Sequence, residues 1–494
     1  MLNRHLRHLF EAAVLALLFV GGFRSLGLLG GWVEVLCALL FPLAISEAAL
    51  RGRGFGWLWL GPFLGMVWGF AWVPATLQSK GGLPYPAALG AAALMWAWEG
   101  LGPALAAWLG AKAARRNRWA GVLVTGLLWL AFERWAFHIY DWSWGSAFGS
   151  LPFLARSAAF LPSPLLGVLA WMAGFAAATG LIDARPRRLL APVGAFLLLV
   201  LLGGFWYALP RGPVRELDVL MIQPNFPSGE RFPGMEARAW EQTDAALARH
   251  RLPNPGRPLL VLWPESAILG QHHLGSIPRL QAEAARRGVA WLFGTEGGPY
   301  NLVRGEVAGR PTFLQAKVVP MAFGERNPGP PAMRHWLDRQ MGILSQEPGR
   351  LTGEAFRIPT PDGDLRVHPL LCSEALLPER TRAGLVGCGA DLLTNHTNDG
   401  WFDRSAATRL HGAQIRLRAA ELGVPMIRST LTGMSGVYRE DGTGGLWGEP
   451  LSRADYAFSL RWRPVRTPAR QALLVPVAAV LLALGAAVLA WRSR

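Results

Sequence analysis

The hydrophobic positions divide the chain into two regions of different pattern. Up to about residue 210, apolar residues form runs of about 20, the length at which a helix crosses the hydrocarbon core of a bilayer. Seven such runs and an eighth near the C-terminus are predicted spans: 8–22, 26–49, 55–76, 85–110, 118–138, 163–182, 188–208 and 471–491. A signal peptide is the alternative for the first run, but no small-residue cleavage site follows it.

Between residues 211 and 467 the apolar runs shorten to strand length and alternate with amphipathic helical patterns. Strands are predicted at 218–223, 258–263, 289–293, 314–319, 365–372, 391–395 and 424–428, and helices at 234–250, 276–287, 376–386 and 404–422. This alternation is typical of an α/β domain. The predicted domains are a membrane domain at 1–210, an α/β domain at 211–467 and a C-terminal transmembrane helix at 468–494.

Composition supports a membrane protein and argues against a nucleic-acid partner. Of 494 residues, 51% are hydrophobic and 17% are charged, against about 25% charged in ordinary soluble domains. This composition excludes a disordered chain and a typical cytosolic enzyme. The formal net charge is +16, but many of the arginines flank the apolar runs, where basic residues set membrane orientation rather than bind nucleic acid.

The basic residues of the short loops predict the orientation. Alternate loops and the chain ends carry thirteen Lys and Arg residues on one side and three on the other, which places both termini in the cytoplasm and the α/β domain outside. Four arginines before the last apolar run would lie outside the cytoplasm in this orientation and so count against it. Long translocated segments, however, only weakly follow the tendency of basic residues to stay in the cytoplasm. Glu99, Glu133 and Arg134 fall inside predicted spans, either along a polar path for a lipid headgroup or in structural pairs.

Three short segments of the α/β domain carry candidate chemistry. Trp263-Pro264-Glu265-Ser266 ends a strand in a carboxylate, and Lys317 is the single lysine between residues 113 and 494. Cys372 lies where a strand gives way to a helix, a position that exposes a thiol to backbone N–H groups able to bind an oxyanion. The alternatives are a chance lysine and a buried structural cysteine. Pairing of Cys372 with Cys388 in a disulfide stays open.

Together these segments resemble the nitrilase superfamily, with its Glu–Lys–Cys triad, and within it the apolipoprotein N-acyltransferase family. The resemblance covers the whole chain. The matching motifs are Ile222-Gln223-Pro224-Asn225-Phe226-Pro227, Trp263-Pro264-Glu265-Ser266, Lys317 with Phe323-Gly324-Glu325, Cys372-Ser373-Glu374, Asn398-Asp399-Gly400-Trp401-Phe402 and Arg428-Ser429-Thr430. The implied fold class is an α-helical polytopic membrane domain joined to a nitrilase-like αββα sandwich.

The resemblance implies acyl transfer through a thioester. Its catalytic residues would be Glu265 as general base, Lys317 as oxyanion donor and Cys372 as nucleophile. The supporting and substrate-binding residues that it implies are Glu325, Glu374 and the backbone of Ser373, and Phe232, Asn301 and Trp401, respectively. The implied acyl donor is a membrane phospholipid and the acceptor is the N-terminal diacylglyceryl-cysteine of an apolipoprotein. No metal or organic cofactor is needed, and the expected location is the bacterial inner membrane, with the catalytic domain outside the cytoplasm.

Some residues depart from the family pattern and leave the acyl-chain preference open. Ser373 stands where the family has an aromatic residue, Phe232 stands in place of a Trp, and Met321-Ala322 varies the lysine motif. An apolar stretch at 328–349 is interpreted as a lid that enters lipid or, alternatively, as a packed helix of the domain. Three other functions compete: a membrane-tethered C–N hydrolase with the same triad, a non-catalytic lipid- or protein-binding scaffold, and a transporter.

Overall fold

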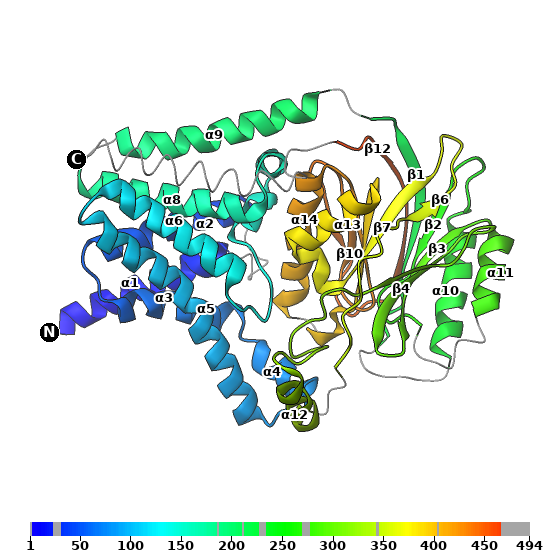
Figure 1. Cartoon of the computed structure of the whole chain (residues 1–494), viewed down its shortest axis with the longest axis horizontal. Coiled ribbons are helices and arrows are strands. Elements are labelled where there is room, and N and C mark those ends of the chain that lie inside the picture. The colour runs from blue at the N-terminus through cyan, green and yellow to red at the C-terminus, as the bar shows by residue number, and fades with distance from the viewer. Residues whose placement is uncertain are drawn as a thin grey trace. The chain divides into compact units, whose positions relative to one another are not determined.

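The computed structural model describes residues 2–22, 31–184, 187–209, 212–226, 234–268, 277–341, 345–402 and 405–465. The chain forms two compact units (Figure 1). One contains Met1–Ser79 and Leu83–Leu209, and the other contains Lys80–Gly82 and Pro210–Arg466. The predicted span at 471–491 lies outside the described residues.

The first unit is helical. Its elements are α1 (Leu2–Gly22), α2 (Gly31–Leu50), α3 (Phe55–Gly69), α4 (Val73–Ser79), α5 (Tyr85–Ala114), α6 (Arg118–Trp135), η1 (Trp144–Ser150), α7 (Pro152–Ala155), η2 (Arg156–Ala159), α8 (Ser163–Ile182) and α9 (Arg187–Ala208). Two of the described helices, α2 and α8, are long and apolar enough to cross a membrane. A third span results if α3 and α4, which meet at 49°, count as one. The apolar run at 55–76 therefore forms two helices, and its pattern hides the break because Phe70 and Trp72 are themselves apolar.

Small residues bring the helices of this unit close together. A Cβ added at Gly110 on α5 would lie 1.9 Å from the hydroxyl of Thr125 on α6, and one added at Gly174 on α8 would lie 2.7 Å from Leu43 on α2. Such close approach maximises van der Waals contact between helices that gain little from the hydrophobic effect in lipid.

The buried carboxylates of the helical unit have protein partners. Glu133 accepts hydrogen bonds from the indole of Trp129 at 2.9 Å and the hydroxyl of Ser143 at 2.7 Å. Glu99 lies 2.9 Å from Nδ1 of His138. These contacts favour structural pairing over the polar path that the sequence left open.

The second unit contains two six-stranded sheets. The first has the order β12-β1-β2-β3-β4-β5 and the second β11-β10-β9-β8-β7-β6. The strands of the first sheet are β1 (Arg215–Gln223), β2 (Leu259–Leu262), β3 (Ala290–Gly297), β4 (Tyr300–Glu306), β5 (Phe313–Ala316) and β12 (Ala454–Trp462). Those of the second are β6 (Phe356–Ile358), β7 (Leu365–Leu371), β8 (Leu392–Thr397), β9 (Met426–Thr430), β10 (Ser435–Tyr438) and β11 (Gly444–Trp447).

Alternation along the strands builds the layers of this unit. Val219 and Leu260 belong to the core between the two sheets, whereas their neighbours Leu220 and Val261 belong to a second core shared with helix α10 (Met235–Arg249). Helices α10 and α11 (Ile277–Arg287) cover the first sheet, and α13 (Pro378–Cys388) and α14 (Ala406–Leu422) cover the second (Figure 1). The result is the helix–sheet–sheet–helix arrangement that the family resemblance implies.

Lys317 lies beyond a strand that is shorter than predicted. The predicted strand at 314–319 ends at Ala316. The amides of Val318 and Val319 donate to the carboxylate of Glu374, at 2.7 and 3.2 Å, instead of continuing the sheet. The strand therefore ends because a side chain from another segment takes over its hydrogen bonds.

The core between the sheets is expected to dominate the stability of this unit. Leu260 is fully buried, whereas Leu314 on β5 is 50% exposed. Leu260→Ala should therefore lower the free energy of unfolding by roughly 2–5 kcal/mol. A thermal melt in detergent should show a fall of about 2–4 °C for each kcal/mol. The matched variant Leu314→Ala should leave the midpoint nearly unchanged, and equal shifts for the two variants would contradict this account of the core.

Candidate active site

Glu265 follows strand β2 and is held by donors from both sheets. Its Oε1 accepts from the amide of Asn301 on β4 at 2.7 Å, and its Oε2 accepts from the backbone N–H of Asn398 at 2.8 Å. The carboxylate is 4% exposed. A Cβ added at Gly294 on β3 would lie 2.4 Å from Cα of Glu265, so only glycine allows β3 to pass this close to the turn.

Lys317 lies between two carboxylates. Its Nζ is 2.7 Å from the carboxylate of Glu325 and 3.6 Å from Oε1 of Glu265, and the residue is 1% exposed. The backbone N–H of Lys317 donates to Asn301 O at 2.8 Å, while Glu325 accepts from the N–H of Met321 at 2.7 Å. The turn after β5 is therefore folded around the ammonium that it carries.

Cys372 begins the 3₁₀ helix η4 (Cys372–Leu376) directly after strand β7. Its φ angle is +47°, a left-handed conformation that a residue with a side chain rarely adopts. Cys372 is 8% exposed and its thiol is free; Cys388 is also free, and its Sγ donates to Gly384 O at 2.9 Å. The disulfide that the sequence left open is therefore absent.

Glu374 joins the lysine turn to the cysteine strand. One of its oxygens accepts from Val318 N and from Nε of Arg380 at 3.1 Å, and the other accepts from Leu371 N at 3.0 Å. Glu374 thus fixes the backbone on both sides of the site, whereas the contact with the Lys317 ammonium is made by Glu325.

The charges of the site act on each other's protonation. Burial raises the pKa of Glu265 above 4.5, and the nearby ammonium of Lys317 only partly offsets this. Burial disfavours the charged form of Lys317, but the carboxylates of Glu325 and Glu265 outweigh that effect and raise its pKa. Burial, followed by the charge of Glu265, raises the pKa of the Cys372 thiol to about 12. At neutral pH the site therefore holds a charged lysine and a neutral thiol.

The structure thus brings Glu265, Lys317, Cys372, Glu325 and Asn301 into one cluster and places Glu374 beside it. Ser373 is partly exposed at the start of η4, and Trp401 is partly exposed in η5 (Asp399–Trp401). The family resemblance implies that Asn301 binds substrate; in the structure its side chain lies between Glu265 and Glu325, 2.7 and 3.2 Å from their oxygens. Phe232 lies outside the described residues.

Sequence reasoning did not assign roles to several residues that hold the site. Asn395 donates to the carbonyl of Cys372 at 3.0 Å, and Arg428 binds Asn395. Arg428 and Asp399 belong to motifs noted in the sequence, so a signal existed for them. Arg380 and Gly294 lie in segments with no motif, and their importance follows only from the contacts of the folded chain.

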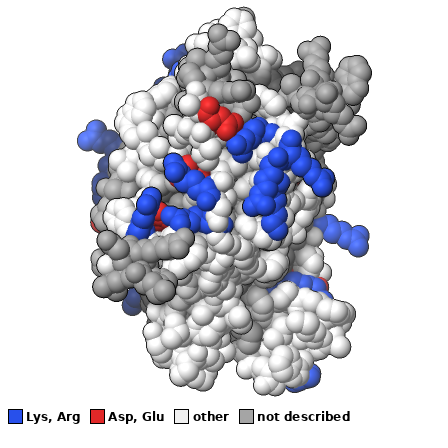
Figure 2. Space-filling model, turned by 90° about the vertical axis from the view of Figure 1, so that its left-hand side faces the viewer, with Lys and Arg blue, Asp and Glu red and all other residues white. Residues whose placement is uncertain are grey.

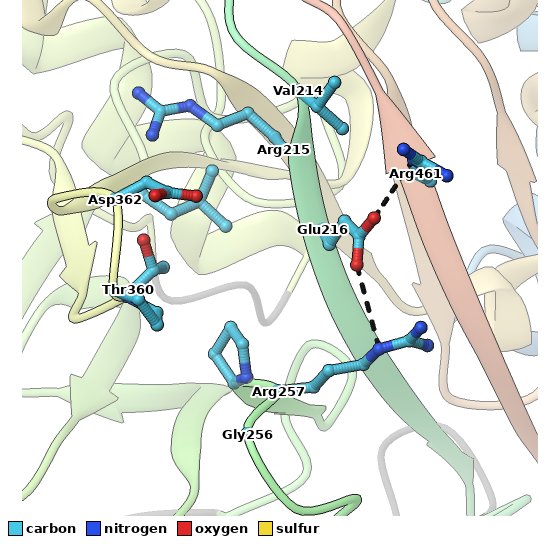
Figure 3. A pocket seen from close by; sticks show the side chains of 11 residues that line it. Val214, Arg215, Glu216, Gly256, Arg257, Thr360, Asp362 and Arg461 are labelled. Atoms are coloured by element: carbon cyan, nitrogen blue, oxygen red, sulfur yellow. Dashed lines mark ion pairs between the residues drawn. The ribbon is translucent and has the colours of Figure 1, made fainter.

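A cavity of about 210 Å³ in the second unit lies away from this cluster (Figure 3). It is lined by the first residues of β1, the turn before β2 and the turn before β7: Val214, Arg215, Glu216, Gly256, Arg257, Pro258, Thr360, Pro361, Asp362, Leu365 and Arg461. Strands β1 and β2 are parallel, and Glu265 and Cys372 follow the carboxyl ends of β2 and β7. The cavity therefore adjoins the opposite ends of the strands that carry these two residues.

Comparison with known proteins gives two results. Residues 300–453 match the carbon-nitrogen hydrolase family model; this segment includes Lys317 and Cys372, while Glu265 precedes it. Apolipoprotein N-acyltransferases are similar over most of the chain. The protein from Methylococcus capsulatus is 30% identical over 432 residues, covering 81% of this chain and 80% of the relative. Those from Allorhizobium ampelinum and Ralstonia nicotianae are 31% and 29% identical, covering 79% and 83% of this chain and 75% and 80% of the relatives.

The raised pKa of Cys372 predicts an unusual pH dependence of its alkylation. In a variant with Cys37→Ser and Cys388→Ser, the rate of reaction with iodoacetamide should keep rising between pH 8 and pH 10, because the thiolate is the nucleophile. An ordinary thiol, with a pKa of about 8.5, levels off in this range. Mass spectrometry of the intact protein measures the rate.

The same experiment with Glu265→Gln tests the electrostatic cause. Removal of the negative charge should lower the pKa of the Cys372 thiol, so that alkylation speeds up at lower pH than in the parent. The pKa should not return to the value of an ordinary thiol, because burial is the larger cause of its rise. An alkylation rate that levels off near pH 9 in the protein that keeps Glu265 would contradict the assigned pKa of Cys372.

Proposed function

Because the chain belongs to the apolipoprotein N-acyltransferase family, we propose that Glu265, Lys317 and Cys372 transfer an acyl chain from a membrane phospholipid to the N-terminal diacylglyceryl-cysteine of an apolipoprotein. The protein is an enzyme of lipoprotein N-acylation. The observation that carries the assignment of residues is the buried cluster in which Lys317 Nζ lies 3.6 Å from Glu265 and acts electrostatically on Cys372.

In the first half of the reaction, Glu265 takes the proton of the Cys372 thiol as sulfur attacks the ester carbonyl of the phospholipid. A C–S bond forms, and the oxyanion of the tetrahedral intermediate is stabilised by Lys317 and the backbone N–H of Ser373. The ester C–O bond then breaks, and the departing lysophospholipid receives the proton from Glu265. The product is a thioester on Cys372.

In the second half, the α-amino group of the lipoprotein attacks the thioester. A C–N bond forms, Glu265 accepts the proton of the amine, and the same donors stabilise the oxyanion. The C–S bond breaks, and the proton on Glu265 returns to sulfur as the amide product leaves. The raised pKa of Glu265 suits a group that alternately accepts and donates this proton.

The basic face of the helical unit supports the proposed orientation, with both termini in the cytoplasm and the catalytic domain outside. On the face presented in Figure 2, more Lys and Arg side chains than Asp and Glu side chains are seen. Two arginines at helix ends of this unit form ion pairs: Arg53 pairs with Glu11 of α1, and Arg118 pairs with Asp183 after α8, each at 2.8 Å. Both arginines belong to loops that the charge count assigns to the cytoplasm.

The segment around helix α12 (Pro331–Met341) suits a contact with lipid. Met333 and Trp336 on this helix are 50% and 54% exposed. The segment forms a helix, but these apolar side chains do not pack into the core as the alternative of a packed helix requires. We propose that they enter the acyl region of the bilayer and admit the phospholipid chain.

The function is tested by supplying a phospholipid and a diacylated lipopeptide to the purified protein in detergent. The wild type should form an acyl-thioester that mass spectrometry detects, and should then yield triacylated peptide. Cys372→Ala should do neither, because the acyl carrier is gone. Lys317→Met should lower the rate by at least about a hundredfold, the usual effect of removing an oxyanion donor.

Cys388→Ser is the matched control, and it should retain wild-type turnover because Cys388 lies on α13, outside the cluster. A wild type that releases free fatty acid at the same rate with and without the lipopeptide would instead favour the C–N hydrolase type of reaction, with water as acceptor. Absence of a thioester would exclude the proposed mechanism.

The lid proposal predicts an effect on lipid entry alone. Trp336→Ser combined with Met333→Ser should raise the apparent KM for phospholipid in mixed micelles several-fold and leave kcat within about twofold, because uniform binding is lost while the chemistry is intact. Val386→Ser, at a position on α13 that is 56% exposed, should change neither constant. An unchanged KM in the double variant would remove the lid.

A further inference from the structure

The backbone of Cys372 is held in a conformation that it would not adopt by itself. A left-handed φ of +47° at a residue with a side chain persists only where surrounding contacts impose it. This conformation turns the chain out of strand β7 into η4. It thereby sets both the direction of the thiol and the position of the following N–H group.

The carbonyl of Cys372 is fixed by Asn395 of the neighbouring strand β8. The side-chain Nδ2 of Asn395 donates to Cys372 O at 3.0 Å, and Asn395 is fully buried. Its Oδ1 accepts from Nη1 of Arg428 at 2.7 Å. A guanidinium can only donate hydrogen bonds, so it fixes which end of the amide faces the nucleophile.

Arg428 has a second buried partner. Its Nη2 donates to Oδ2 of Asp399 at 2.6 Å, and the other oxygen of Asp399 lies 3.0 Å from Nδ1 of His411. Arg428, Asp399 and His411 are each at most 1% exposed. A buried ion pair contributes little to stability compared with apolar packing, so its presence here favours a role in fixing geometry.

Residues 395–398, at the end of β8, also hold the carboxylate of Glu265. The N–H of Asn398, directly after β8, donates to the carboxylate of Glu265 at 2.8 Å. Residues 395–398 therefore contact the proposed nucleophile at its carbonyl and the proposed general base at its carboxylate. They set the distance between the two.

We propose that Asn395 and Arg428 are positioning residues that clamp the carbonyl of Cys372 and so align its thiol with Glu265. The inference rests on the proposed role of Cys372 as the nucleophile. Neither residue touches the reacting atoms. Replacing them should therefore change the rate at which the thiol attacks the acyl donor and not the binding of the donor.

The test compares Asn395→Leu with wild type in single-turnover formation of the Cys372 thioester. Leucine has a similar volume but lacks the donor. The acylation rate at saturating phospholipid should fall about ten- to a hundredfold, the range expected for misplacement of a reacting group by up to about 1 Å. The apparent KM for phospholipid should change less than threefold. Arg428→Lys, which keeps the charge but loses the two-armed geometry, should give a smaller fall of the same kind and serves if Asn395→Leu does not fold.

Ile427→Val is the matched control for a general loss of stability. Ile427 precedes Arg428 on β9 and is fully buried in the core between the sheets, so it should lower the melting temperature without changing the acylation rate. Wild-type acylation by folded Asn395→Leu or Arg428→Lys would overturn the proposal, as would a fall matched by Ile427→Val.

Alkylation of Cys372 by iodoacetamide at pH 9 separates this inference from the proposed function. The rate should rise in Asn395→Leu and Arg428→Lys, because a thiol that no longer faces Glu265 is farther from the negative charge that helps to raise its pKa. If the wild type forms no thioester but alkylation is faster in the variants, the proposed function fails and the clamp stands. Alkylation at the wild-type rate in both variants would contradict the clamp whatever the acyl donor.

Discussion

The buried ammonium of Lys317 is the interaction on which the rest of the site depends. An unpaired charge at 1% exposure is prohibitively costly, so carboxylates must accompany it. Glu325 lies 2.7 Å and Glu265 3.6 Å from the ammonium. Glu325 is folded back by the turn after β5, and Glu265 is brought in from β2. Burial of one cation thus requires a strand end and a turn from separate parts of the sequence to meet, and this meeting creates the site.

The nucleophile imposes the second constraint. Cys372 must leave strand β7 with its thiol directed at the base, and its left-handed backbone has to be held from outside. Glu374 holds the strand end and the lysine turn together through their N–H groups, while Asn395 holds the carbonyl of Cys372. These residues make no contact with an acyl group in the proposed reaction. They attach Cys372 to the rigid second sheet, so that its thiol stays aligned with the carboxylate of Glu265.

Much of this unit could be predicted from local pattern. Strands β1, β2, β3, β7, β8 and β9 and helices α10, α11, α13 and α14 coincide with predicted ones within a few residues, because alternating burial and amphipathic periodicity are local properties. Strand β5 ended early because Glu374, 55 residues away, takes the hydrogen bonds of Val319. The position of Asn301 between two carboxylates and the contacts of Arg428 also depend on which strands lie near each other in the fold, which no local pattern encodes. The triad itself came from resemblance of motifs rather than from periodicity.

The protonation states explain why this site can use a neutral thiol. A preformed thiolate at Cys372 would be buried and would add a third negative charge beside Glu265 and Glu325, with only Lys317 to balance it. Its pKa is raised first by burial and then by the charge of Glu265. In the proposed reaction, Glu265 takes the thiol proton during attack, so that the base becomes neutral while negative charge moves from the carboxylate to the acyl oxygen. The net charge of the cluster stays constant, and the new charge develops where Lys317 and the start of η4 can stabilise it. The thiol therefore becomes a strong nucleophile only when an acyl carbonyl is present to receive the charge, which favours transfer between lipids over unproductive reactions of a resting thiolate.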